Sequence, residues 1–126
     1  MIERYSLPRM SAIWSDENRF RKMLDVEIFA CEALARLGKI PKAALFQIQK
    51  KAHFDVERIR EIEAETNHDV IAFIKNISEN IGEDAKYVHM GLTSSDVLDT
   101  ALSAQMREAC DILIEDVQKL LKIMAR

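Results

Sequence analysis

Hydrophobic side chains recur at three- and four-residue steps through most of the chain, which predicts helices rather than strands. Capping residues, glycines and prolines divide this pattern into separate elements. The helices expected before residue 95 cover residues 16–37, 41–52, 56–65 and 70–80. The residues that suit their beginnings are Ser15 or Asp16, Pro41, Asp55 and Asp69. Residues 1–10 lack a periodic pattern, so they are expected to form an extended or irregular arm, and residues 83–95 a connection.

The last segment, residues 96–126, is the longest helical pattern and contains no glycine or proline. Ser94 or Ser95 is its expected N-cap. At 1.5 Å per residue such a helix extends about 46 Å, whereas a compact chain of this size has a radius of gyration of roughly 13–14 Å. Its apolar stripe consists of Leu98, Leu102, Ala109, Leu113, Leu120 and Met124, and it is widened by Val97, Ala101, Ile112, Val117 and Leu121. We expect helices from outside this chain to cover much of that stripe, and we expect the chain to be part of a longer protein.

Composition narrows the fold class to a folded, helical chain. Of its 126 residues 48% are hydrophobic, which argues against disorder. With only 3 Gly and 2 Pro there are few turn residues, so many-stranded sandwiches and barrels are not expected. Cys31 and Cys110 lie too far apart in the chain for a C-x2-C zinc pattern, and the three histidines lack metal-ligand spacing, so no metal site is expected. The predicted class is all-α.

The charge and hydropathy of the chain argue against two kinds of partner, nucleic-acid polymers and membranes. The net charge is −3 and no basic stripe occurs, so no nucleic-acid polymer is expected as a partner. The sequence has no apolar run near the roughly 18 residues of a membrane span and no apolar segment at its beginning. Two cysteines without a secretory signal are typical of the reducing cytosol, so the expected location is cytoplasmic.

Two polar segments stand where helices are expected to begin. Asn67, His68 and Asp69 precede one helix, and Thr93 and Ser94 precede the longest one. The first N–H groups of a helix are unpaired and carry partial positive charge, which suits an anionic ligand. A histidine at such a place can donate a proton or a hydrogen bond. Both segments are also ordinary helix caps, and spacing alone favours capping.

The chain resembles the adenylosuccinate lyases, a family of the fumarase/aspartase superfamily, in three separated segments. They read IERYS at residues 2–6, EAETNHDV at residues 63–70 and VHMGLTSSDVLDT at residues 88–100. Their order and spacing match the family, and the resemblance runs over the whole chain. It implies an N-terminal helical domain over residues 1–92. It further implies that residues 93–126 begin the first long helix of a central helical bundle, which four identical subunits build together.

The resemblance also implies a reaction and roles for particular residues. The reaction is β-elimination of fumarate from adenylosuccinate, which yields AMP, and from the succinylated aminoimidazole carboxamide ribotide of purine biosynthesis, with no cofactor. Arg4 and Tyr5 are implied to hold the phosphate region, with His89 near it, and Thr93 and Ser94 to bind a substrate carboxylate. The remaining implied substrate-binding residues are Asn67, His68 and Asp69.

Among these residues His68 is implied to support catalysis by orientation and charge stabilisation. The main acid and base are implied to lie beyond residue 126, so the isolated chain is expected to be inactive. Two alternatives remain open. One is another lyase of the superfamily, of the argininosuccinate or carboxymuconate type, and the other is a non-catalytic helical oligomerisation module. The Arg4–Tyr5 and Asn67–Asp69 motifs favour adenylosuccinate lyase.

Overall fold

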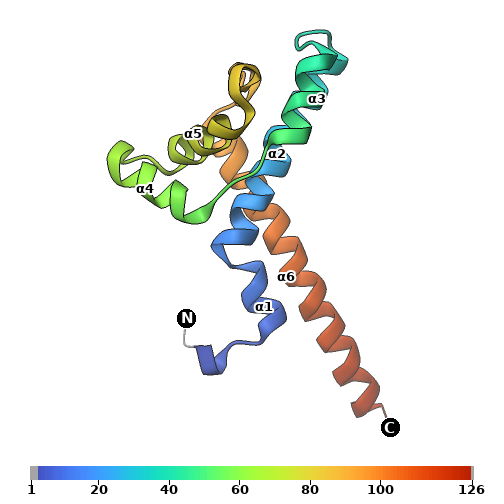
Figure 1. Cartoon of the computed structure of the whole chain (residues 1–126). Coiled ribbons are helices and arrows are strands. Elements are labelled where there is room, and N and C mark those ends of the chain that lie inside the picture. Colours follow the sequence, from blue (N-terminus) through green and yellow to red (C-terminus); the bar gives the residue numbers. More distant parts are fainter. Residues whose placement is uncertain (1–2, 126) are drawn as a thin grey trace.

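The computed structural model describes residues 3–125, and every regular element among them is a helix (Figure 1). This result confirms the all-α class. In chain order the elements are the 3-10 helix η1 (Glu3–Tyr5), α1 (Pro8–Ile13), α2 (Asp16–Arg36), α3 (Lys42–Lys51), α4 (Val56–Thr66), α5 (Asp69–Ile81), the 3-10 helix η2 (Gly82–Tyr87) and α6 (Ser94–Met124). No helix in the described part of the chain is both long enough and apolar enough to cross a membrane.

The N-terminal arm is more regular than the sequence predicted. Its expected irregular conformation is wrong for residues 3–5 and 8–10, which form η1 and the start of α1, and confirmed for residues 6 and 7; residues 1 and 2 lie outside the described part. Pro8 stands at the first position of α1, where its missing N–H costs nothing, and Ser11 N–H bonds to the Leu7 carbonyl at 2.9 Å. A helix of six residues is too short for a periodic pattern to reveal it.

Helices α2 and α6, the two longest helices, pack against each other along the middle of the molecule (Figure 1). The side chains that α6 buries recur every fourth residue, at Val97, Ala101, Gln105 and Ala109. The Gln105 amide donates to the Ile13 carbonyl at 2.6 Å, and this bond joins α6 to the end of α1. Val97, Ala101 and Ala109 belong to the apolar face predicted from sequence, whereas Gln105 was not expected in it and the predicted Leu102 is 47% exposed.

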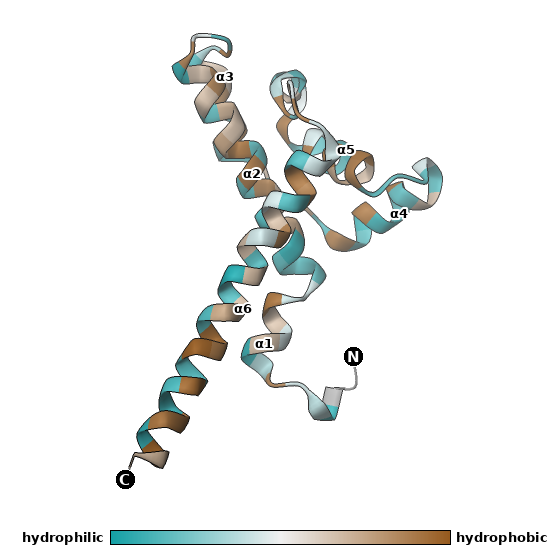
Figure 2. Cartoon of the chain, turned by 180° about the vertical axis from the view of Figure 1, so that it is seen from behind, coloured by the Kyte–Doolittle hydropathy of each residue, from teal (hydrophilic) through white to brown (hydrophobic). Residues whose placement is uncertain are grey.

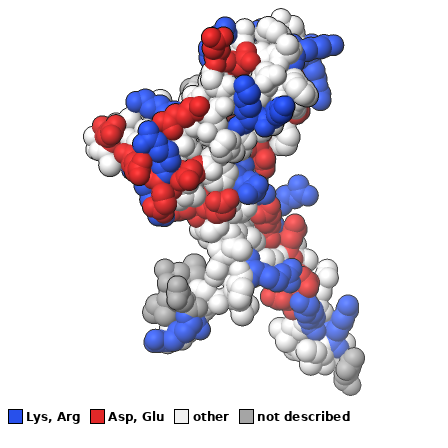
Figure 3. Space-filling view, in the orientation of Figure 1, with Lys and Arg blue, Asp and Glu red and all other residues white. Residues whose placement is uncertain are grey.

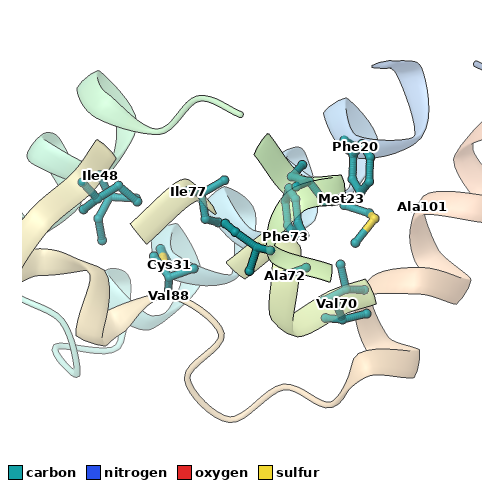
Figure 4. Close-up of a cluster of buried hydrophobic side chains, with 14 of the residues drawn as sticks. Phe20, Met23, Cys31, Ile48, Val70, Ala72, Phe73, Ile77, Val88 and Ala101 are labelled. Carbon is teal, nitrogen blue, oxygen red and sulfur yellow. The ribbon is translucent and has the colours of Figure 1, made fainter. Parts of the chain in front are cut away.

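The hydrophobic core is shared by α2, α3, α4, α5 and the beginning of α6 (Figure 4). Phe20 of α2 stacks on Phe73 of α5 with ring centroids 5.7 Å apart. Val70, at the start of α5, and Ala101 of α6 are both buried in the same cluster. This packing holds the first turn of α5 and the first turns of α6 to one core, so the two polar segments predicted from sequence have fixed supports.

Ion pairs fix α4 on its neighbours and give that part of the surface mixed charge (Figure 3). Arg58 donates to both Glu79 oxygens, at 2.8 and 3.2 Å, and also pairs with Glu61. Arg60 pairs with Asp16 at the start of α2, at 2.8 Å. These pairs are exposed, so each contributes little to stability on its own.

The C-terminal half of α6 extends beyond the rest of the molecule, and hydrophobic residues alternate with polar ones along it (Figure 2). Its exposed large hydrophobic residues are Leu113, Ile114, Val117, Leu120, Leu121, Ile123 and Met124. Each of them keeps 55–75% of its surface exposed, which confirms that residues 3–125 do not bury the apolar stripe of this helix.

Candidate active-site segments

The turn between α4 and α5 carries the first polar segment. Asn67 takes a left-handed conformation with φ +52° and ends α4, and its N–H donates to the Glu63 carbonyl at 2.8 Å. Asparagine tolerates this conformation better than most residues. His68 then returns to an extended conformation, which makes it the residue from which α5 starts.

His68, rather than the predicted Asp69, is the N-cap of α5. The Ile71 N–H donates to His68 Nδ1 at 3.3 Å, while Asp69 is already helical and accepts from the Val70 N–H at 2.7 Å. Since Nδ1 accepts a hydrogen bond, the neutral ring carries its hydrogen on Nε2. The side chain is 48% exposed. The geometry therefore presents an N–H donor at a helix N-terminus, where an anion is favoured.

The beginning of α6 carries the second polar segment. Thr93 is its N-cap, not the predicted Ser94 or Ser95. Its N–H and its hydroxyl both donate to the Asp96 carboxylate, at 2.8 and 3.1 Å. The Thr93 N–H, then its hydroxyl, and to a smaller extent the nearby His89 hold the pKa of Asp96 below its usual value. The N–H groups of Ser94 and Ser95 have no acceptor within the helix, so they face a ligand or solvent.

His89 is held by a residue that the sequence did not reveal. It has a left-handed φ of +60°, and its backbone N–H donates to Glu27 Oε2 at 2.8 Å. Its ring Nδ1 lies 2.6 Å from Glu27 Oε1. Glu27 is on the buried face of α2, in step with Phe20, Met23 and Cys31. A carboxylate on an otherwise apolar helix face is the one signal that could have indicated it.

Arg4 and Tyr5 lie in η1, on the exposed N-terminal arm. Arg4 Nη2 donates to the Tyr5 hydroxyl at 3.2 Å, and the guanidinium carbon lies 4.8 Å from the ring centroid. Tyr5 is 72% exposed. It borders a mainly apolar cavity of about 520 Å³ between the arm and the middle of α6, which Ile112 and Asp116 line from the other side.

Comparison with known proteins decides the family. A family model described as "Lyase" matches residues 3–126. The chain belongs to this lyase family. It is 56% identical over 124 residues to the adenylosuccinate lyase of Bacillus subtilis (strain 168), covering 98% of this chain and 29% of that protein. It is 53% identical over 122 residues to that of Synechocystis sp. (strain ATCC 27184 / PCC 6803 / Kazusa), covering 97% and 28%. The lyase chain thus spans about three tenths of the length of these curated relatives.

Solved structures agree with the fold of the lyase chain. A fumarate lyase from Mesorhizobium sp. BNC1 superposes with a TM-score of 0.82 at 26% identity, over 90% of this chain and 27% of that one. A 3-carboxy-cis,cis-muconate lactonizing enzyme from Pseudomonas putida superposes with a TM-score of 0.83 at 31% identity, over 92% and 28%. The fumarase-type helical fold expected from the sequence is confirmed.

Within residues 3–125 the predicted site residues of the lyase chain are not joined to one another by side-chain contacts across the three segments. In residues 3–125 no hydrogen bond or ion pair joins His68 to His89, to Thr93 or to the Arg4–Tyr5 pair. The arm lies beside the middle of α6, apart from the beginning of that helix (Figure 1). No group of three metal-ligating side chains occurs in the described part. The described residues thus present three separate open segments.

Proposed function

We propose that this chain supplies substrate-binding segments of an adenylosuccinate lyase. The observation that carries the proposal is the geometry of His68, whose Nδ1 is engaged by the α5 backbone so that a neutral ring offers Nε2–H at the N-terminus of that helix. The 56% identity to the Bacillus subtilis adenylosuccinate lyase supports the same reading. The substrate of such an enzyme carries a phosphate and two carboxylates, and helix N-termini bind such groups.

The proposed reaction is elimination of fumarate from adenylosuccinate, which leaves AMP, and from the succinylated aminoimidazole carboxamide ribotide. His68, with Asn67 and Asp69 beside it, orients the substrate and donates a hydrogen bond to it. Thr93 and Ser94 bind a succinyl carboxylate at the start of α6. Arg4, Tyr5 and His89 bind the phosphate region.

The rest of the catalytic site comes from outside these 126 residues. An elimination needs a base and an acid on opposite sides of the bond that breaks, and we assign neither to this chain. We propose that residues 93–126 belong to a central bundle, that residues 1–92 form a separate helical domain, and that further copies of the protein cover α6 in a homotetramer. The chain alone is then inactive, and the whole enzyme acts in the cytoplasm.

Turnover by a full-length enzyme that contains this chain tests the proposal. We expect it to convert adenylosuccinate to AMP and fumarate, and to leave argininosuccinate and carboxymuconate substrates unchanged. Turnover of a carboxymuconate substrate instead would support the alternative that the Pseudomonas putida structure represents. If the enzyme turned over none of these substrates, the remaining hypothesis would be a non-catalytic helical oligomerisation module.

His68→Gln in that enzyme tests the assigned role directly. A hydrogen bond to a charged group contributes about 1.5–3 kcal/mol, so kcat/KM should fall by roughly 10- to 150-fold. His53→Gln is the matched control, because His53 is exposed and its Nδ1 lies against the Lys51 carbonyl, away from the proposed site. Equal activity of the two variants would refute the role of His68.

A further inference from the structure

Glu27 is the one charged side chain that is buried in the described part of the chain, at 1% exposure. Both of its carboxylate oxygens contact the same residue, because Oε2 accepts from the His89 N–H and Oε1 lies 2.6 Å from His89 Nδ1. A buried carboxylate is costly unless it is paired and hydrogen-bonded. His89 therefore supplies the partner that allows a carboxylate at this place.

Within residues 3–125, His89 is the only basic side chain paired with Glu27. Cys31 on the same face of α2 has its pKa raised to about 11, first by burial and then by the charge of Glu27, so its thiol is neutral at pH 7. The Cys31 thiol donates to the Tyr87 carbonyl, not to Glu27. Asp96 of α6 is near enough to His89 for the two charges to interact, and it is an anion.

The backbone at His89 is arranged for this double contact. Its left-handed φ of +60° turns the N–H and the ring toward the same carboxylate. A residue other than glycine adopts this conformation only where its surroundings hold it there. The ring is then bound through Nδ1, and its Nε2 has no partner within residues 3–125. The side chain keeps 20% of its surface exposed, close to the segment that leads into α6.

We propose that Glu27 is the positioning residue of His89, holding the ring through Nδ1–H so that a protonated Nε2 donates to the phosphate of the nucleotide. Glu27 provides the counter-charge of the imidazolium, while Nε2 provides the contact with substrate. This inference rests on the proposed adenylosuccinate lyase function for the identity of the anion. Glu27 does not touch the substrate, and it acts on the phosphate only through His89.

Glu27→Gln in the full-length enzyme tests this role by a split between KM and kcat. Glutamine offers one acceptor and one N–H2 donor, so it cannot accept from both the His89 N–H and Nδ1–H as two carboxylate oxygens do. We expect KM for adenylosuccinate to rise about tenfold, with kcat changed less than about twofold. Affinity for succinyladenosine, which lacks the phosphate, should not change. Glu17→Gln is the control, since it removes the same charge from an exposed place on the same helix.

His89→Gln completes the experiment as a double-mutant cycle. If Glu27 acts through His89, the double variant should have the same KM as the His89 variant alone. If the effects of the Glu27 and His89 substitutions on KM were independent and additive, the proposal would be overturned. It would also be overturned if the Glu27 variant lost as much affinity for succinyladenosine as for adenylosuccinate.

Nitrogen NMR of wild-type enzyme with labelled histidine shows which His89 nitrogen atoms carry hydrogen. This measurement does not depend on whether a substituted enzyme folds. We expect His89 to keep a hydrogen on Nδ1 and, with AMP bound, on Nε2 as well. A His89 ring without hydrogen on Nδ1 would overturn the proposal. If the enzyme does not convert adenylosuccinate at all, the proposed function fails, while the NMR result still decides how Glu27 holds His89.

Discussion

At the scale of single residues, His68 and His89 are both held through Nδ1 but with different partners. A backbone N–H donates to His68, which fixes the hydrogen of the neutral ring on Nε2. A buried carboxylate faces His89, which favours hydrogen on Nδ1. Each ring is thus held through Nδ1, one by the backbone at the start of α5 and the other by a buried carboxylate before α6.

Glu115 offers a residue-scale test of how the arm is held on α6. Hydrogen bonds from Arg9 and then Lys119 lower its pKa from 4.5 to about 2. Because this pKa is lower in the folded chain than in the unfolded chain, the Glu115 carboxylate stabilises the fold at pH values above about 4.5. That contribution is lost as the pH falls from about 4.5 toward 2. We expect the carboxyl carbon resonance of Glu115 to titrate near pH 2. Arg9→Gln should move this midpoint toward 4.5, and an unchanged midpoint would show that Arg9 does not hold Glu115.

The two cysteines should differ in reactivity. Cys31 is buried and its pKa is raised to about 11, so very little thiolate forms at pH 8, whereas Cys110 is exposed. A thiol reagent should therefore modify Cys110 in the folded chain and Cys31 only in denaturant, as peptide mass mapping would reveal. Rapid labelling of Cys31 in the folded chain would contradict the packing of α2 described above.

At the scale of elements, capping decides where each helix starts. The Ser15 hydroxyl oxygen accepts from the Asn18 N–H at 3.2 Å at the start of α2, while its own hydrogen goes to the Ala12 carbonyl. Ser15→Ala should therefore lower the free energy of unfolding by about 1 kcal/mol, measured by urea denaturation. Ser95→Ala is the control, because Ser95 is exposed and lies in the first turn of α6 without being its N-cap, which is Thr93. An equal effect of the two changes would contradict the capping role of Ser15.

Helix bounds follow from local sequence patterns more closely than caps and long-range contacts do. Periodicity predicts α2, α4 and α5 to within a residue or two, because each has a clear apolar face. The cap of α5 could not be predicted, since it depends on Asn67 ending the previous helix in a left-handed conformation. Glu27 and His89 are 62 residues apart, and no local pattern links them; only the packing of α2 against the segment before α6 does.

At the scale of the whole molecule, α6 leaves a long apolar surface uncovered. Its exposed residues include Leu113, Val117 and Leu120, at the three- and four-residue spacing of a helix that packs against others. We expect the 126-residue chain to associate with itself, with a sedimentation coefficient that rises with concentration. Leu120→Asp should weaken this association strongly, because it places a charge in the apolar contact. Gln118→Asp, an exposed polar position on the same helix, should not. A chain that stays monomeric throughout would contradict the bundle.

The central claim is that these residues serve an adenylosuccinate lyase site, and a chimera tests it most directly. The corresponding segment of the Bacillus subtilis adenylosuccinate lyase, to which this chain is 56% identical, would be replaced by this chain. The measurement is conversion of adenylosuccinate to AMP and fumarate. We predict a kcat/KM within about tenfold of the parent enzyme, a difference of less than about 1.4 kcal/mol in transition-state stabilisation. A chimera that folds and assembles like the parent but releases no fumarate would contradict the account.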